Sequence, residues 1–238
     1  MYRSLSTLVT TLLVACSATG SEPPAQAAAG GDSTMVVASE VRVPSDGRPT
    51  VVFLGTSITA GLGLEREADG WVAQVEQIAD SAGVPFRAVN AGVSGETSAG
   101  GLRRLDWVLR QPMDVLVVEL GANDGLRGQD PFSMRSNLTA IIRQTRTRYP
   151  NARIVLAGME APPNLGPIYT AAFRAVFAEV AEQEQTALIP FLLDGVAGIP
   201  ELNQADRIHP TPEGHRLIAY TAWPVLERVL RELPEDRP

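Results

Sequence analysis

Short apolar runs of strand length alternate with longer segments of helical periodicity along most of this 238-residue chain. The apolar runs lie at residues 50–54, 86–90, 114–120, 153–157 and 187–191. Strands that alternate with helices in this way pair into a parallel sheet, and the helices cover both of its faces. The sequence therefore predicts one three-layer α/β/α domain over residues 48–233, built around a five-stranded parallel sheet.

Two of the expected helices carry clear start signals. Asp130-Pro131 and Thr211-Pro212 each combine a favourable N-cap residue with proline at the first helical position. Pro224 is expected to kink or restart the last helix, because proline has no N–H for the helical hydrogen bond. The remaining helices are expected over about residues 71–79, 98–110 and 168–182.

The first 16 residues have the pattern of a secretory signal. Arg3 gives a positive start, and residues 5–14 are apolar apart from serine and threonine. This run is shorter than the roughly 20 residues that cross a bilayer, and it fits the apolar core of a signal peptide. It ends in Leu-Val-Ala-Cys at residues 13–16, which is similar to the bacterial lipobox, in which the cysteine is lipidated. Cleavage at a neighbouring alanine, with Cys16 incidental, is the alternative.

Residues 17–47 are rich in alanine, serine, glycine, proline and acidic residues, and they lack a sustained apolar period. Such a segment buries too little surface to offset the entropy lost on ordering. We interpret it as a flexible tether, with an average reach of about 30 Å for ~30 residues. Residues 234–238 are interpreted as a tail after the domain.

Scarce residue types limit the chemistry of this chain. It contains one cysteine and two histidines, and all 20 of its Lys and Arg residues are arginine. Without lysine there is no Schiff-base or pyridoxal chemistry and no lysine-dependent phosphate-binding loop. One cysteine cannot form a disulfide framework or a cysteine-rich metal site. With only two histidines, a histidine-rich metal cluster is also excluded.

The charge of the chain argues against nucleic acid as a partner. The net charge is −7, from 20 basic and 27 acidic side chains, and no basic cluster occurs in the sequence. Binding to phosphate backbones depends on such a cluster.

Polar and glycine-containing segments follow four of the expected strands, at residues 55–63, 91–97, 121–128 and 203–212. In parallel sheets, ligands bind beyond the carboxyl ends of the strands. Ser57 follows the first strand directly, where a helix dipole would favour developing negative charge. Its alternative role is a helix cap. The sequence contains no Gly-x-Ser-x-Gly, so it lacks the nucleophile elbow of the α/β-hydrolases.

His209 is the better placed of the two histidines. Asp206 precedes it by three residues, a spacing that lets the carboxylate hold one ring nitrogen while the other faces a nucleophile. Alternatively, Asp206 caps a turn and His209 is a structural loop residue. His215 has no carboxylate at such a spacing, and we expect it to have a packing or surface role.

Asn123 and Gly95 are candidates for binding an anion. Asn123 follows the third strand and could direct its amide at an oxyanion, or it could form an Asx-turn with Asp124. Gly95 is either a turn residue or a backbone N–H donor. Each signal alone is weak, and their common location at one sheet edge favours the functional interpretation.

Taken together, these segments resemble the SGNH (GDSL-type) hydrolases, in particular their thioesterase/lysophospholipase/arylesterase subgroup. The resemblance covers about residues 50–222. Residues 55–61, 90–98, 118–128 and 206–210 resemble the four family blocks in order, and residues 161–166 resemble a substrate-side loop of the subgroup. Thr56 stands where the family usually has aspartate. Because threonine can still accept a backbone hydrogen bond, activity is expected to be retained.

The resemblance implies a flavodoxin-like fold and a serine hydrolase without a cofactor. It implies that Ser57 attacks the substrate, His209 is the base, and Asp206 orients His209. The backbone amides of Ser57 and Gly95 and the side-chain amide of Asn123 would bind the oxyanion. The implied substrates are aryl or short- to medium-chain acyl esters, lysophospholipids and acyl thioesters.

An apolar acyl pocket is expected where loops surround this site, with Leu62, Leu64, Leu126, Met159 and Leu165 as candidate lining residues. Two alternatives remain, a non-catalytic lipid- or glycan-binding envelope lipoprotein on the same scaffold and a carbohydrate O-deacetylase. We expect a monomer that is anchored through Cys16 in the bacterial cell envelope, at the periplasmic face or the outer membrane. A secreted or soluble periplasmic protein is the alternative location.

Overall fold

The computed structural model describes residues 47–234, and these contain a five-stranded parallel sheet with the strand order β2-β1-β3-β4-β5. The strands are β1 (Thr50–Gly55), β2 (Arg87–Gly92), β3 (Val115–Glu119), β4 (Arg153–Ala157) and β5 (Ala187–Ile189). Every residue of β1 and β3 is buried, as expected for central strands covered on both faces. The predicted fold class is confirmed. The signal segment, Cys16, nearly all of the expected tether and residues 235–238 lie outside the described residues.

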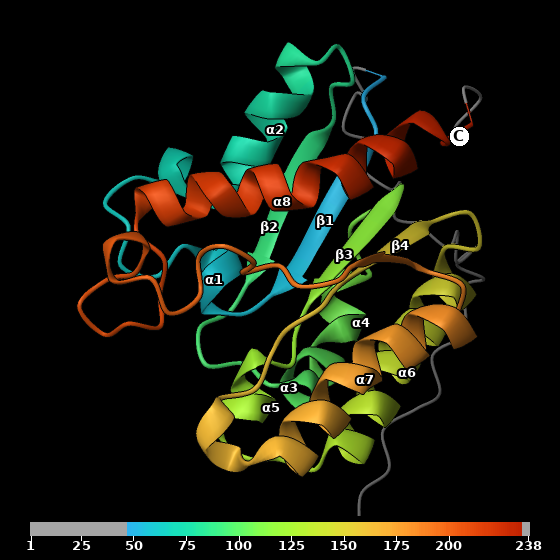
Figure 1. Ribbon diagram of the computed structural model, residues 1–238. Helices are drawn as coiled ribbons and strands as arrows, with labels where there is room; N and C mark the ends of the chain where they lie inside the picture. Colours follow the sequence, from blue (N-terminus) through green and yellow to red (C-terminus); the bar gives the residue numbers. More distant parts are fainter. Residues whose placement is uncertain (1–46, 235–238) are drawn as a thin grey trace, which may run out of the picture. The chain divides into compact units, whose positions relative to one another are not determined.

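Helices cover the two faces of the sheet in separate layers (Figure 1). One layer consists of α2 (Trp71–Ser81) and α8 (Pro212–Arg231). The opposite layer consists of α3 (Ser98–Arg103), α4 (Leu105–Val108), α5 (Ala122–Leu126), α6 (Pro131–Arg148) and α7 (Pro167–Gln183). The four-residue α1 (Ser57–Ala60) follows β1 directly. Three 3₁₀ turns complete the described elements: η1 (Glu67–Asp69), η2 (Pro163–Leu165) and η3 (Pro200–Leu202).

Aromatic side chains fill the space between the sheet and the α2–α8 layer. The ring of Phe53 contacts that of Trp71 edge-to-face at a centroid distance of 5.1 Å. The ring of Phe86 lies on the same side, with its centroid 6.2 Å from that of Phe53. All three side chains are fully buried. This aromatic packing holds the first turn of α2 against β1.

The helix expected over residues 98–110 forms two short helices instead of one. They meet at Arg104, which leaves the helical conformation and whose side chain donates hydrogen bonds to the carbonyls of Ala91 and Gly55. Gly100 and Gly101 lower the helical propensity just before this point. A Cβ on Gly101 would lie 2.4 Å from the side chain of Leu120, so glycine is required there for close packing.

Other boundaries also differ from expectation. Helix α8 continues through Pro224, so of the two effects expected of this proline, a kink or a restart, the restart is wrong. Because Pro224 has no N–H, the carbonyl of Tyr220 lacks its usual helical hydrogen bond. Tyr220 is 52% exposed, so water can reach this turn of the helix. Strand β5 ends at Ile189, two residues earlier than expected.

The N-caps Asp130 and Thr211 are confirmed, since each side chain accepts hydrogen bonds from N–H groups of its helix's first turn.

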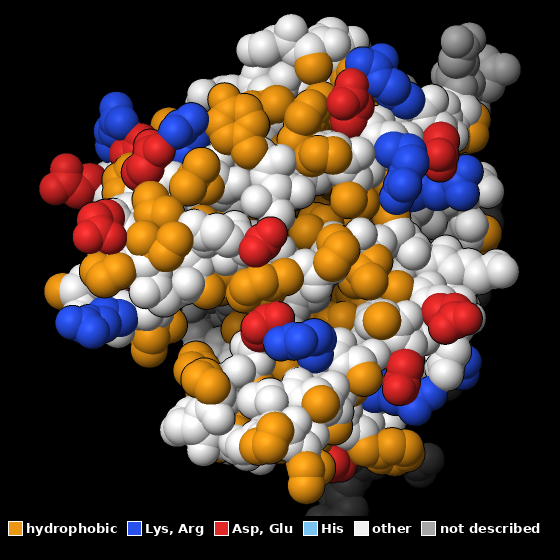
Figure 2. Space-filling view, viewed as in Figure 1, with side chains coloured by type: hydrophobic (Ala, Val, Ile, Leu, Met, Phe, Trp, Pro, Cys, Tyr) orange, Lys and Arg blue, Asp and Glu red, His pale blue; other side chains and the backbone are white. Residues whose placement is uncertain are grey.

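Charged side chains lie close to partners of opposite sign on the face seen in Figure 2, and no extended basic area occurs there. Ion pairs of the described residues include Arg174–Glu160 and Arg135–Glu179. None of the helices within residues 47–234 combines the length and apolar character needed to cross a membrane.

Candidate active site

Ser57 occupies the first position of α1, at the carboxyl end of the central strand β1. Thr56 is the N-cap, and its side-chain oxygen accepts a hydrogen bond from Ile58 N–H at 3.4 Å. This matches the expectation that threonine can replace the family aspartate as a backbone acceptor. The short helix ends at Gly61, which adopts a left-handed conformation with φ 70°. Ser57 is thereby held at a tight turn between strand and helix, and it is 7% exposed.

Asp206 and His209 lie on a loop that returns to this same edge of the sheet. The loop is closed by an antiparallel bridge between Asn203 and Pro210 and by a hydrogen bond from Gln204 N–H to the carbonyl of His209 at 2.7 Å. One oxygen of Asp206 accepts the backbone N–H groups of Ile208 and His209, at 2.9 and 3.0 Å. Asp206 and His209, at the predicted spacing of three residues, therefore lie on one hydrogen-bonded turn.

The three residues Ser57, His209 and Asp206 form a continuous hydrogen-bonded chain. His209 Nδ1 lies 2.6 Å from Asp206 Oδ2, and His209 Nε2 lies 2.9 Å from Ser57 Oγ. Hydrogen bonds from the His209 side chain and from backbone amides lower the pKa of Asp206 to about 2. The carboxylate is thus ionised at neutral pH, holds the proton on Nδ1 and leaves Nε2 to accept the proton of Ser57.

Gly95 and Asn123 lie on two different segments that polar contacts tie together. Asp124, buried next to Asn123, accepts hydrogen bonds from Ser98 N–H at 2.8 Å and from its hydroxyl at 2.6 Å. Arg127 donates to the carbonyl of Gly95 at 2.9 Å. Asn123 belongs to α5, so a helical turn stands where the sequence offered an Asx-turn with Asp124 as the alternative.

The donor groups of Gly95 and Asn123 remain available. Gly95 has φ 76°, a conformation that favours glycine. Within residues 47–234, neither its N–H nor the side-chain amide of Asn123 donates a hydrogen bond to another protein group. Free donors on two braced segments are what an oxyanion site requires.

His215 has a structural environment. It is 1% exposed, and its Nδ1 accepts a hydrogen bond from Trp71 N–H at 3.2 Å. Burial lowers the pKa of His215 to about 4, so its ring is neutral at physiological pH. Of the two roles expected from the sequence, packing is confirmed and a surface role is wrong.

The five candidate substrate residues lie in different environments. Leu62 and Leu126 are 44% and 47% exposed, and Leu64 and Leu165 are half-buried. Met159 is buried in the core at 2% exposure and presents little surface to a ligand. Sequence reasoning missed two exposed apolar residues that neighbour the site residues in the chain, Val93 and Ile208.

A cavity of about 470 Å³ lies beside the hydrogen-bonded chain rather than at it. Its lining includes Thr59 of α1, Val72 of α2, Asn90 of β2 and Leu64 from the segment between α1 and η1. It does not include Ser57 or His209. Within the described part of the chain, no group of three or more His, Cys, Asp and Glu side chains is placed to hold a metal ion.

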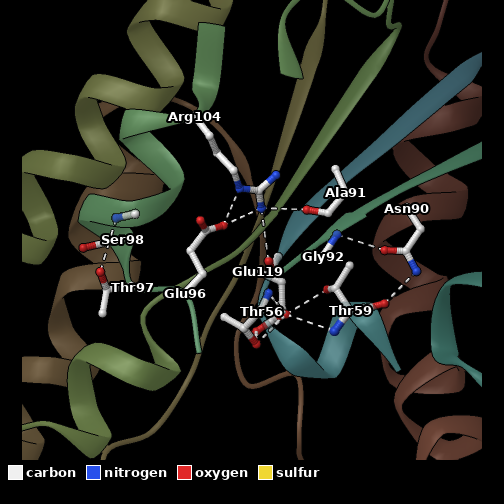
Figure 3. A network of polar contacts seen from close by, with 12 residues as sticks. Thr56, Thr59, Asn90, Ala91, Gly92, Glu96, Thr97, Ser98, Arg104 and Glu119 are labelled. Atoms are coloured by element: carbon white, nitrogen blue, oxygen red, sulfur yellow. Dashed lines mark hydrogen bonds and ion pairs between the residues drawn. The ribbon is translucent and has the colours of Figure 1, made fainter. Parts of the chain in front are cut away.

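Sequence reasoning also missed Glu119, the last residue of β3. Its side chain is fully buried and accepts hydrogen bonds from Thr56 and Thr59, which flank Ser57 (Figure 3). Burial raises the pKa of Glu119 to about 7, although these donors act in the opposite direction. The available signal was a glutamate at the end of an otherwise apolar strand.

Arg104 connects the ends of two strands near this carboxyl group. It pairs with Glu96 and donates to the carbonyls of Ala91 at 2.7 Å and Gly55 at 3.3 Å (Figure 3). The carboxyl ends of β1 and β2 are thus held together by one partly buried guanidinium group.

Introducing the family aspartate at Thr56 should make stability depend more steeply on pH. Because folding raises the pKa of Glu119 from 4.5 to about 7, the folded state binds more protons across that range and loses stability as pH rises through it. A second buried carboxyl group beside Glu119 strengthens this loss of stability at higher pH, because two adjacent negative charges in a buried site repel each other. We expect Thr56→Asp to lower the thermal midpoint more at pH 8 than at pH 5. Thr56→Ser, which keeps the hydroxyl, is the control, and an equal pH dependence in both variants would contradict the expectation.

Comparison with known proteins gives a consistent result. Residues 53–217 match the model of the GDSL-like Lipase/Acylhydrolase family. Esterase TesA of Pseudomonas aeruginosa is 43% identical over 182 residues, which cover 76% of this chain and 89% of that protein. An arylesterase of Vibrio mimicus is 35% identical over 170 residues, covering 71% and 84% of the two chains. Thioesterase 1/protease 1/lysophospholipase L1 of Escherichia coli is 36% identical over 172 residues, covering 71% and 79%.

Solved structures share the same fold over nearly their whole length. The crystal structure of TesA superposes with a TM-score of 0.72 at 42% identity, covering 76% of this chain and 99% of that one. Psychrotrophic esterase EstA from Pseudoalteromonas sp., in a form inhibited by monoethylphosphonate, gives a TM-score of 0.72 at 34% identity and covers 77% and 100%.

Proposed function

The chain belongs to the GDSL-like lipase/acylhydrolase family and is a carboxylic ester hydrolase, and we propose that it cleaves its substrates with Ser57 as nucleophile. The observation that carries this proposal is the unbroken sequence of contacts from Asp206 through His209 to Ser57, at 2.6 and 2.9 Å. A base oriented by a carboxylate and placed on a serine hydroxyl is the arrangement that activates serine for attack on an acyl carbon.

In the first step, Ser57 Oγ bonds to the acyl carbon while its proton passes to His209 Nε2. The carbonyl oxygen becomes an oxyanion, which the N–H groups of Ser57 and Gly95 and the amide of Asn123 stabilise. His209 then gives its proton to the departing alcohol or thiol as the carbon–oxygen or carbon–sulfur bond breaks. In the second step, water attacks the acyl-enzyme while its proton passes to His209. The bond between the acyl carbon and Ser57 Oγ then breaks as His209 returns the proton to Oγ, and the acid is released.

We further propose aryl and short- to medium-chain acyl esters as substrates, with lysophospholipids and acyl thioesters as further candidates. The relatives are named as an esterase, an arylesterase and a thioesterase/lysophospholipase. Exposed apolar side chains near the site residues in the chain, such as Leu62, Leu126 and Ile208, favour an acyl or aryl group. Each methylene of the acyl chain that these side chains cover contributes about 0.8 kcal/mol to binding, so the extent of the apolar surface sets the preferred chain length.

Hydrolysis of p-nitrophenyl butyrate, combined with fluorophosphonate labelling, tests the nucleophile. We expect rapid hydrolysis and label on Ser57, identified by peptide mass spectrometry. A series from p-nitrophenyl acetate to laurate then measures the chain-length preference. Label on another residue would overturn the assignment of Ser57.

Asn123→Ala should lower kcat by about 10²–10³-fold, equivalent to ~3–4 kcal/mol of transition-state stabilisation. The reason is the loss of one oxyanion donor while the nucleophile and base stay in place. Asn123→Asp keeps the shape and removes the donor, so it should be at least as impaired. Asn151→Ala, an exposed asparagine before β4, is the control and should match wild type. A change of only a few-fold in Asn123→Ala would identify Asn123 as a structural residue.

We also propose that the protein is a monomer anchored in the bacterial cell envelope through lipidated Cys16. The support is the lipobox-like end of the apolar N-terminal run and the tether-like composition of residues 17–47. Metabolic labelling with an alkyne analogue of palmitate should mark the wild-type protein and not Cys16→Ser. An unlabelled wild type would favour the secreted or soluble periplasmic alternative.

A further inference from the structure

Glu119 lies directly beside the segment that carries Ser57. In the parallel pairing of β1 with β3, Gly55 is the register partner of Glu119. The glutamate side chain passes Gly55 and reaches the next turn. A Cβ on Gly55 would lie 2.7 Å from Glu119 Oε2, so the approach requires glycine at this position. The sheet register therefore places a carboxyl group against residues 56–60, which we call the nucleophile loop.

Four donors of the nucleophile loop converge on one oxygen of Glu119. Oε2 accepts the N–H of Thr56 at 2.8 Å and that of Thr59 at 3.3 Å. It also accepts the hydroxyl of Thr59 at 2.8 Å and that of Thr56 at 3.0 Å, which also lies 3.0 Å from Oε1 (Figure 3). These donors come from the residue before Ser57 and from the residue two positions after it.

These hydrogen bonds to Glu119 stabilise α1, which is too short to be stable by itself. A four-residue helix cannot form alone in water, because nucleation costs more than its few hydrogen bonds return. Its first N–H groups have no helical partner and need an external acceptor. Glu119, 0% exposed and fixed at the end of a central strand, provides one. Ser57 is the first residue of this supported helix.

We propose that Glu119 is a positioning residue, whose buried carboxyl group holds the nucleophile loop so that Ser57 Oγ meets His209 Nε2. This inference rests on the proposed role of Ser57 as nucleophile. Glu119 acts through Thr56 and Thr59 and does not touch the substrate. A displacement of about 1 Å at the reacting group can cost 10²-fold in rate, so loss of this support should reduce turnover strongly.

The test compares Glu119→Ala with Glu119→Gln. The alanine variant removes the acceptor, and we expect kcat for p-nitrophenyl butyrate and the rate of fluorophosphonate labelling to fall by about 10²-fold, with KM within about 3-fold. Glutamine can place its carbonyl oxygen at the Oε2 position and donate from its amide to Thr56 Oγ1. We therefore expect Glu119→Gln to recover most of the rate.

Thr59→Val and Thr59→Ser provide a milder pair in case Glu119→Ala does not fold. Thr59 is 1% exposed, and valine keeps its shape while removing the 2.8 Å contact to Glu119. We expect kcat to fall by about 10-fold in Thr59→Val, from the loss of one of the four hydrogen bonds to Glu119 Oε2, and to stay near wild type in Thr59→Ser.

Glu184→Ala is the matched control for removing a buried carboxyl group. Glu184 is 7% exposed, follows α7 and pairs with Arg143 and Arg146, remote from the nucleophile loop. It should lose thermal stability and label at the wild-type rate. If folded Glu119→Ala or Thr59→Val is labelled at the wild-type rate while Ser57→Ala is inactive, the positioning role of Glu119 is overturned and the nucleophile role of Ser57 stands. An active Ser57→Ala would instead overturn the proposed nucleophile.

Discussion

Replacing Ser57 by alanine is expected to lower turnover of an activated ester by about 10⁴–10⁶-fold, as in other serine triads. Without Oγ there is no atom to form the acyl-enzyme, and His209 loses the partner that lies 2.9 Å from its Nε2. The remaining rate would come from substrate binding and from the oxyanion donors acting on water. Steady-state hydrolysis of p-nitrophenyl butyrate measures this effect.

Ser81→Ala is a suitable control for Ser57→Ala. Ser81 is an exposed residue at the end of α2, and its hydroxyl donates only to the carbonyl of Gln77 in the same helix. This variant should hydrolyse the ester and react with fluorophosphonate at the wild-type rate. Near wild-type turnover by Ser57→Ala would show that another group performs the chemistry.

Replacing His209 by alanine should have an effect of similar size, whereas replacing His215 should leave turnover nearly normal. His209 contacts both Asp206 and Ser57, so its loss removes the base and isolates the carboxylate from the nucleophile. A reduction of about 10⁴–10⁶-fold in kcat is expected, because triad members act as a unit. Kinetics with purified, folded variants measure the contrast.

His215→Ala serves as the internal control for that experiment. The variant loses the hydrogen bond to Trp71 N–H and the packing of a buried ring, so its free energy of unfolding should fall. Activity per folded molecule should remain. The opposite result, with His215 essential and His209 dispensable, would reverse the assignment of the base.

The order and type of the main elements could be predicted because their signals are local. The apolar run of β3 and the Asp130 and Thr211 caps each act within a few residues of their own positions. The break at Arg104 could not be predicted in this way. It depends on carbonyl groups of Gly55 and Ala91, 49 and 13 residues away in the chain.

Glu119 illustrates the same limit within the candidate site. Its strand could be recognised, but its partners Thr56 and Thr59 lie 63 and 60 residues earlier. Only the register of β1 against β3 brings them within hydrogen-bonding distance. Met159 is a second case, because its position after β4 suggested a pocket residue and tertiary packing placed it in the core.

The sequence by itself determined the strand–helix alternation, the family blocks and the local pairing of Asp206 with His209, since three residues on a turn suffice to form that contact. Tertiary structure decided that His209 meets Ser57, which is 152 residues away. It also decided that Glu119 supports the nucleophile loop. The physical reason is that a parallel sheet aligns the carboxyl ends of distant strands at one edge, and its strand order and register select which side chains meet there.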